Sequence, residues 1–195
     1  ITDLRRNLRP LSQHQRQLST GLIVSRAEDN PQTIGTIIRM NEQIADMDQY
    51  EVNSLLARDF LDNSESALSR VSVNLQRVRE LIIRAANGIN DASDRTAMRP
   101  EFTQMLDDIV ASANQRFGDQ FLFSGTKTGV EPFSLNTGTL VVTYSGNNSN
   151  IVREIDTGQT IVVNQAGDDG AGTGVFQTVF GALKTAIDAI DANDP

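Results

Sequence analysis

Residues 61–86, LDNSESALSRVSVNLQRVRELIIRAA, contain neither glycine nor proline and repeat apolar side chains at alternating spacings of three and four. This repeat is typical of a narrow helical seam that packs against a neighbouring helix, as in a coiled coil. The only polar residue at a position of this apolar repeat is Ser64, and the repeat continues to Ala85. The predicted structural seam consists of Leu61, Leu68, Val71, Leu75, Val78 and Ile82. The sequence therefore predicts a long helix held by packing along one side.

The helical pattern extends toward the N-terminus. Residues 32–86 contain a single glycine, Gly35, and no proline, which predicts either one very long helix or two helices with a break near Asn53. Residues 1–18 repeat leucines at helical spacing and begin without a capping residue. The last helical pattern runs almost to Pro195, so we expect further chain beyond both ends of this sequence.

A change of composition follows the third helical segment, which covers 102–117 and has Pro100 either at its start or as a kink. Ten of the fourteen glycines lie between Gly118 and Gly174. Strands are predicted at 121–123, 140–144, 151–155 and 160–163, the last three as an antiparallel meander. Helical spacing then returns at 176–190.

These patterns predict an α+β fold. Residues 1–118 together with 176–195 are expected to form an elongated helical rod domain of the coiled-coil or bundle type. Residues 119–175 are expected to form a small, glycine-rich antiparallel β domain, inserted before the return helix and projecting from the rod.

Composition narrows the function classes. The chain has 195 residues, of which 38% are apolar and 22% charged, and no apolar run approaches the thickness of a bilayer, so no membrane partner is predicted. The net charge of -8 disfavours nucleic acid as a partner. The absence of cysteine excludes disulfides and thiolate metal sites, and the single histidine, His14, is interpreted as a solvent-facing side chain.

Two stretches partly match the motifs of cofactor or metal sites. Gly170-x-Gly172-x-Gly174 lacks the third glycine at the spacing of a dinucleotide fingerprint, because that position is Val175. The acidic pair Asp168–Asp169 lacks the glutamate that closes a calcium loop. We therefore predict no cofactor, no metal and no catalytic residue, and the chain is not expected to be an enzyme.

The charges are segregated along the helical segments. Residues 1–26 carry five arginines and one aspartate, whereas residues 42–65 carry seven acidic residues and one arginine. Antiparallel neighbours could pair these segments, but two solvated faces explain the pattern equally well, because exposed ion pairs contribute at most about 1 kcal/mol.

Three motifs carry a resemblance to a known family. The stretch 18–31, LSTGLIVSRAEDNP, resembles the turn near the start of bacterial flagellins and of the hook-filament junction proteins called hook-associated protein 3. The stretch 75–88, LQRVRELIIRAANG, is similar to the end of their shared long helix. The stretch 117–133 reads FGDQFLFSGTKT and ends in PF, which resembles the junction proteins more than the flagellins. The residues that match are Leu18, Ser19, Gly21, Arg77, Glu80, Leu81, Asn87, Gly88, Phe123, Gly125, Pro132 and Phe133.

The resemblance implies an extracellular structural protein, exported through the flagellar secretion apparatus and placed as a ring between hook and filament. Its implied partners are other copies of itself, the first hook-associated protein and flagellin. An export chaperone would bind a C-terminal region that lies outside this sequence. Without its terminal core helices, the chain is expected to be monomeric in solution.

Two other interpretations stay open at this point. A minor flagellin would share the same motifs and would differ in being made in far more copies. A coiled-coil adaptor or signalling module would instead form a stable dimer in dilute solution.

Overall fold

The computed structural model describes residues 10–11, 14–15, 18–19, 21, 31–86, 92–168 and 174–192. Its contacts divide the chain into two units, Ile1–Glu51 and Val52–Pro195. The helices are α2 (Pro31–Ala85), α3 (Ala92–Ala113) and α4 (Val175–Asp191). The strands are β1 (Arg116–Phe117), β2 (Gln120–Phe121), β3 (Phe133–Asn136), β4 (Val141–Tyr144), β5 (Val152–Asp156) and β6 (Gln159–Val162). The predicted α+β class is confirmed, with helices first, short antiparallel strands next and a helix last.

Helix α2 is continuous over 55 residues and has no break near Asn53. The side chain of Asn53 contacts a later segment of the chain, since its Nδ2 donates a hydrogen bond to the Glu154 backbone oxygen at 2.8 Å. Helix α2 contains no proline after its first residue, Pro31, and only one glycine. Its local sequence therefore does not interrupt the backbone hydrogen bonds.

The buried row of α2 differs in part from the predicted seam. Val71 and Val78 are buried, and Leu75 packs against the core as a partly buried side chain. Leu61, Leu68 and Ile82 are 44%, 36% and 40% exposed. The buried side chains are Ala57, Phe60, Ser64, Ala67, Val71, Val78, Leu81 and Ala85.

The predicted seam and the buried row both repeat at spacings of three and four residues, and they share Val71 and Val78. They therefore lie next to each other on one wide apolar face of α2. The spacing of the apolar residues therefore predicted which face of α2 is buried. It did not predict the row at the centre of that face, because several of its residues are alanine or serine and not leucine. Ser64 satisfies its buried hydroxyl locally by donating to the Phe60 backbone oxygen at 2.9 Å.

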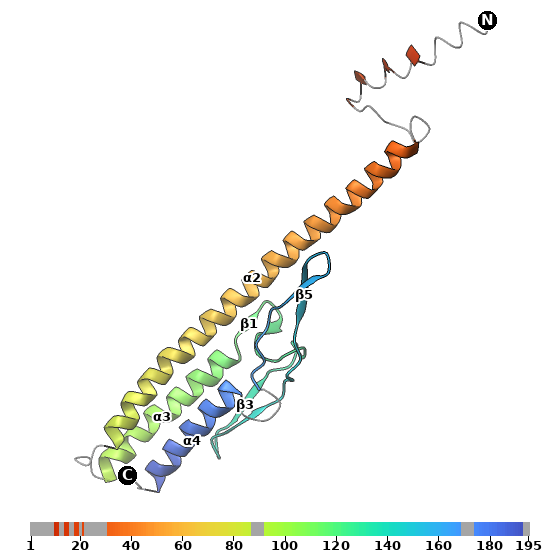
Figure 1. The fold of residues 1–195 in the computed structure, drawn as a ribbon. Helices are drawn as coiled ribbons and strands as arrows, with labels where there is room; N and C mark the ends of the chain where they lie inside the picture. The colour runs from red at the N-terminus through yellow and green to blue at the C-terminus, as the bar shows by residue number, and fades with distance from the viewer. Residues whose placement is uncertain are drawn as a thin grey trace, which may run out of the picture. The chain divides into compact units, whose positions relative to one another are not determined.

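Helices α2, α3 and α4 run side by side within the second unit, with α3 in the middle (Figure 1). Pro100 lies inside α3. The α3 side chains Phe102, Leu106, Ile109 and Ala113 are fully buried and follow the predicted spacing. The return helix is confirmed as α4, whose buried residues are Phe176, Phe180, Leu183, Ile187 and Ile190.

The strands form three separate antiparallel hairpins, so the predicted meander is wrong. Strand β4 pairs with β3, a strand that the sequence did not predict, and β5 pairs only with β6. The physical reason lies in Asn114, at the end of α3. Its Oδ1 accepts from the Phe133 backbone nitrogen at 2.9 Å and its Nδ2 donates to the Phe133 backbone oxygen at 2.7 Å, which holds β3 against the helix.

The core is continuous from the helices into the hairpins. The Phe133 ring lies 5.2 Å from that of Phe176, 5.3 Å from that of Phe180 and 5.1 Å from that of Tyr144. Such aromatic contacts add to the free energy gained by burying the rings. Residues of the predicted rod and of the predicted β domain thus share one hydrophobic cluster.

Candidate assembly surface

The turn after β2 is closed by Asn147. Gly125 has φ +67°, and a Cβ at this position would collide with the backbone and side-chain oxygens of Asn147. Asn147 Oδ1 accepts from the Thr126 backbone nitrogen, and its Nδ2 donates to Thr126 Oγ1, both at 2.8 Å. Only glycine combines this backbone conformation with so close an approach. Gly125, one of the residues that match the family motif, therefore has a structural role in this turn.

Tyr144 lies beneath the same turn. Its hydroxyl is 2.9 Å from the Phe123 backbone oxygen and 2.8 Å from the Asn147 backbone oxygen, and it donates to one of them at a time. Burial raises the pKa of Tyr144 above its ordinary value, because the phenolate would lose hydration. Phe123 and Phe133 are fully buried beside it. These contacts hold the turn against the buried side chains beneath it.

The motif at the end of α2 joins two helices. Leu81 is 1% exposed and belongs to the core. Arg77 donates to Glu101 on α3 at 2.6 Å and pairs with Glu80 at 3.2 Å. The hydrogen bond to Glu101 is the main reason that the pKa of Arg77 is raised. Arg77 and Leu81 thus have different roles, one on the surface and one in the core.

Leu18 and Ser19 are exposed, and Gly21 has φ +70°, a left-handed conformation that glycine adopts readily. Pro132 is fully buried. Asn87 and Gly88 lie outside the described residues, so the predicted helix stop at these positions stays a prediction.

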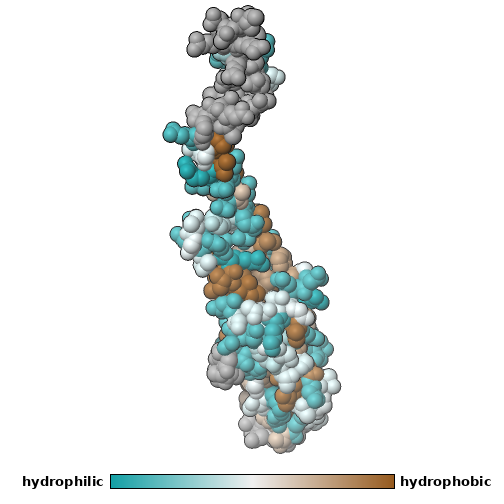
Figure 2. Space-filling model, turned by 90° about the vertical axis from the view of Figure 1, so that its right-hand side faces the viewer, coloured by the Kyte–Doolittle hydropathy of each residue, from teal (hydrophilic) through white to brown (hydrophobic). Residues whose placement is uncertain are grey.

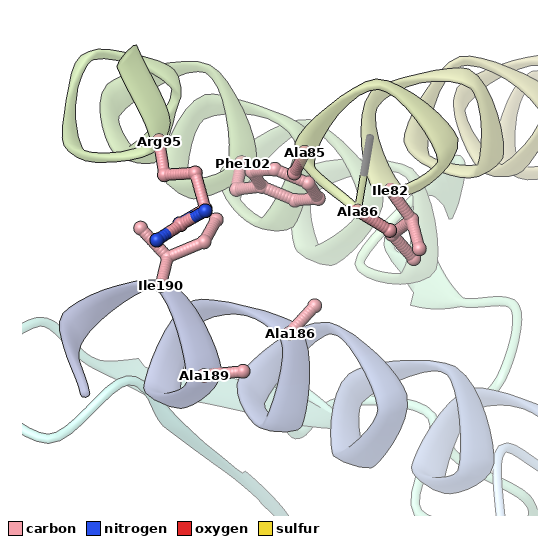
Figure 3. A pocket seen from close by; sticks show the side chains of 8 residues that line it. All are labelled: Ile82, Ala85, Ala86, Arg95, Phe102, Ala186, Ala189 and Ile190. Carbon is pink, nitrogen blue, oxygen red and sulfur yellow. The ribbon is translucent and has the colours of Figure 1, made fainter. Parts of the chain in front are cut away.

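A small apolar cleft lies where α2 and α4 end and α3 begins (Figure 3). Side chains of α2 and α4 face each other across it, and Phe102 of α3 lies between them. Arg95 is the one ionisable group in its lining. The lining residues are Ile82, Ala85, Ala86, Arg95, Phe102, Ala186, Ala189 and Ile190. A cleft lined by alanine and isoleucine is suited to packing rather than to acid–base chemistry.

Many large apolar side chains of α2 are exposed. In the first unit they are Ile37, Ile38, Met40, Ile44 and Met47, and in the second unit Val52, Leu55, Leu56, Leu61, Leu68, Val73, Ile82 and Ile83. Figure 2 shows brown apolar groups interspersed with teal polar ones over the surface. Exposed apolar groups in this number on one helix indicate contact surfaces.

Among the residues that the structure describes, no three histidine, cysteine or acidic side chains gather as metal ligands would. Within the same residues, none of the helices combines the length and apolarity needed to span a membrane.

Comparison with known sequences gives the family. Residues 1–128 match the family model described as the bacterial flagellin N-terminal helical region. A flagellin of Clostridium tyrobutyricum is 32% identical over 120 residues, which cover 61% of this chain and 32% of the flagellin. The flagellar filament 33 kDa core protein of Treponema phagedenis is 30% identical over 69% of this chain and 46% of its own length. The chain thus spans a third to a half of these curated relatives.

Comparison with solved structures finds similar folds among flagellar hook-associated proteins. A putative flagellar hook-associated protein from Vibrio parahaemolyticus is 26% identical with a TM-score of 0.67, covering 87% of this chain and 84% of that one. Flagellar hook-associated protein-3 from Legionella pneumophila is 27% identical with a TM-score of 0.64, covering 68% of this chain and 40% of that one. The family match covers well over half of the sequence, and the chain therefore belongs to the bacterial flagellin family.

Proposed function

We propose that this protein forms the junction between the flagellar hook and the flagellin filament, as a ring of like subunits. As a member of the flagellin family it is a structural protein of the extracellular flagellum and not an enzyme. The observation that carries the junction role is the fit to the Vibrio parahaemolyticus hook-associated protein over most of both chains. The Gly125 turn supports the same choice, because its sequence resembles the junction proteins.

The proposed partners follow from this place in the flagellum. They are neighbouring copies in the ring, the first hook-associated protein on the hook side and flagellin on the filament side. Export through the flagellar secretion apparatus, with a chaperone bound to a C-terminal region, belongs to the same proposal. A ring between two unlike structures needs different surfaces above and below, hence heterologous contacts.

We further propose a division of labour within the chain. Residues 1–118 with 176–195 carry the axial load, since long packed helices resist bending. Residues 119–175 make lateral contacts. The continuous hydrophobic cluster between the two parts supports a firm connection between them.

A minor filament subunit is the second candidate, because the curated relatives at 30–32% identity are flagellins and filament core proteins. The two functions differ in what the loss of the gene does. Deletion in the native bacterium should leave hooks without filaments and release flagellin into the medium. Hooks that still carry filaments after deletion would contradict the junction role and favour the minor subunit.

A further inference from the structure

The hairpin of β5 and β6 lies beside α2 but takes no part in the hydrophobic cluster (Figure 1). None of the residues 152–162 is buried, and Ile155 and Ile161 are only half-buried. The hairpin of β3 and β4 differs, because it places Phe133 and Val142 in the cluster. A two-stranded hairpin by itself is only marginally stable in water. The position of β5 and β6 therefore depends on a small number of contacts.

The base of this hairpin is held in place by Asn164, which is 8% exposed. Its Oδ1 accepts a hydrogen bond from the Ile151 backbone nitrogen at 2.6 Å, and its Nδ2 donates to the Ser149 backbone oxygen at 3.1 Å. Three residues further along the chain, the Gly167 backbone nitrogen donates to the Phe123 backbone oxygen at 2.9 Å. The base is thus joined to the core, so a movement of β5 and β6 has to pivot there.

Beyond the base, the hairpin contacts α2 through Asn53. The side-chain Nδ2 of Asn53 donates to the Glu154 backbone oxygen at 2.8 Å. Within the described ranges, no salt bridge joins β5 or β6 to a helix. A single neutral hydrogen bond contributes only about 1 kcal/mol net. The contact at Asn53 therefore closes the hairpin onto α2 weakly.

A hollow of about 320 Å³ lies between the hairpin and α2. Its walls come from α2, from the β1–β2 hairpin and from the base of the β5–β6 hairpin, and consist of Leu56, Phe60, Phe117, Asp119, Gln120, Ile151, Arg153 and Val163. A space of this size means that the hairpin and the helix do not pack closely, so few dispersion contacts hold them together. The hairpin is consequently far easier to lift than a packed strand pair.

We propose that β5 and β6 form a hinged arm that lifts from α2 while the helices and the β3–β4 hairpin stay folded. The base at Asn164 is the hinge, and the hydrogen bond from Asn53 is the latch. Lifting the arm uncovers the hollow, where the rings of Phe60 and Phe117 meet edge to face with centroids 6.0 Å apart. The arm thus controls the access of other molecules to this aromatic pair. This inference goes beyond the proposed function, because it concerns a movement within one chain.

Native-state hydrogen exchange of the 195-residue chain, measured for single amides by NMR, tests the independent opening. Once lifted, the two strands are marginally stable, so their amides exchange. The exchange rates of the β5 and β6 amides should change little in low concentrations of urea, because a local opening exposes little surface. The amides of the buried α3 residues Phe102 and Leu106 should exchange more slowly and with a clear dependence on urea.

The latch is tested with a matched pair of variants. Asn53 and Asn63 are both half-buried on α2, but Asn63 Nδ2 donates within the helix, to the Asp59 backbone oxygen at 2.7 Å. Asn53→Ala should speed the exchange of the β5 and β6 amides about fivefold, as the loss of one hydrogen bond predicts. Asn53→Asp should act in the same direction, because a carboxylate cannot donate. Asn63→Ala should leave these amides unchanged.

Three results would overturn the proposal. In the first, the β5 and β6 amides exchange at the rate and with the urea dependence of the α3 amides, so that the hairpin opens only when the whole chain unfolds. In the second, Asn53→Ala and Asn63→Ala have equal effects on β5 and β6. In the third, Asn53→Ala speeds exchange equally in β3, β4 and α3. None of these results bears on the junction role, which gene deletion tests separately.

Discussion

The path of the chain between β2 and β3 depends on a few side chains. Gly125 allows Asn147 to approach the backbone, and the Tyr144 hydroxyl contacts the carbonyl oxygens of Phe123 and Asn147. Asn147 and Tyr144 are far from the turn in sequence, so local patterns could not predict that they close it. Position 125 requires glycine because Asn147 comes close to the backbone there in the folded chain.

Gly125→Ala should lower the free energy of unfolding by about 1–3 kcal/mol, because alanine is strained at positive φ and its Cβ meets Asn147. Gly129→Ala is the control, since its added Cβ meets no atom within 4 Å and its φ is not positive. Urea unfolding of both variants measures the difference. Equal stability of the two would contradict the described turn.

The pH dependence of stability should carry a contribution from Tyr144. Its pKa is raised in the folded state, so the folded chain holds this proton more tightly than the unfolded chain. The stabilising contribution is complete below the unfolded pKa of about 10 and is lost as the pH rises through the higher folded pKa. The unfolding free energy of the native chain should thus fall more steeply above pH 10 than that of Tyr144→Phe. Parallel pH curves for the two chains would argue against burial of the hydroxyl.

At the scale of the element, α2 shows why some positions of the predicted seam are buried and others are not. Leu75 packs against the core, whereas Leu61 is 44% exposed although it belongs to the same heptad position. Leu75→Asp should therefore cost about 2 kcal/mol or more, since it places an unpaired charge against apolar groups. Leu61→Asp should stay within about 0.5 kcal/mol. Thermal unfolding of both variants checks this, and a larger loss for Leu61→Asp would place the core on the other row.

The helices could be predicted from sequence because each buries a periodic stripe. The 3.6-residue period predicted α4 and the buried residues of α3 directly. The pairing of β3 with β4 could not be predicted in the same way. Strand β3 is positioned by hydrogen bonds from Asn114, which lies just after α3, and its own sequence has no clear strand pattern.

At the scale of the whole molecule, the chain combines a shared hydrophobic cluster with extensive exposed apolar surface on α2. The cluster gives a stable subunit, and the exposed groups are suited to contact with other proteins. A catalytic role would need convergent polar groups in a cleft, whereas the cleft at the helix ends is lined mainly by alanine and isoleucine. These features agree with a structural protein of the flagellum.

The most direct test of the junction role is the position of the protein on the assembled flagellum. Antibodies against this chain, with gold labels, would be imaged by electron microscopy on flagella from the native bacterium. The account predicts a label confined to the boundary between hook and filament on each flagellum. A label distributed along the filament would contradict it and identify a filament subunit.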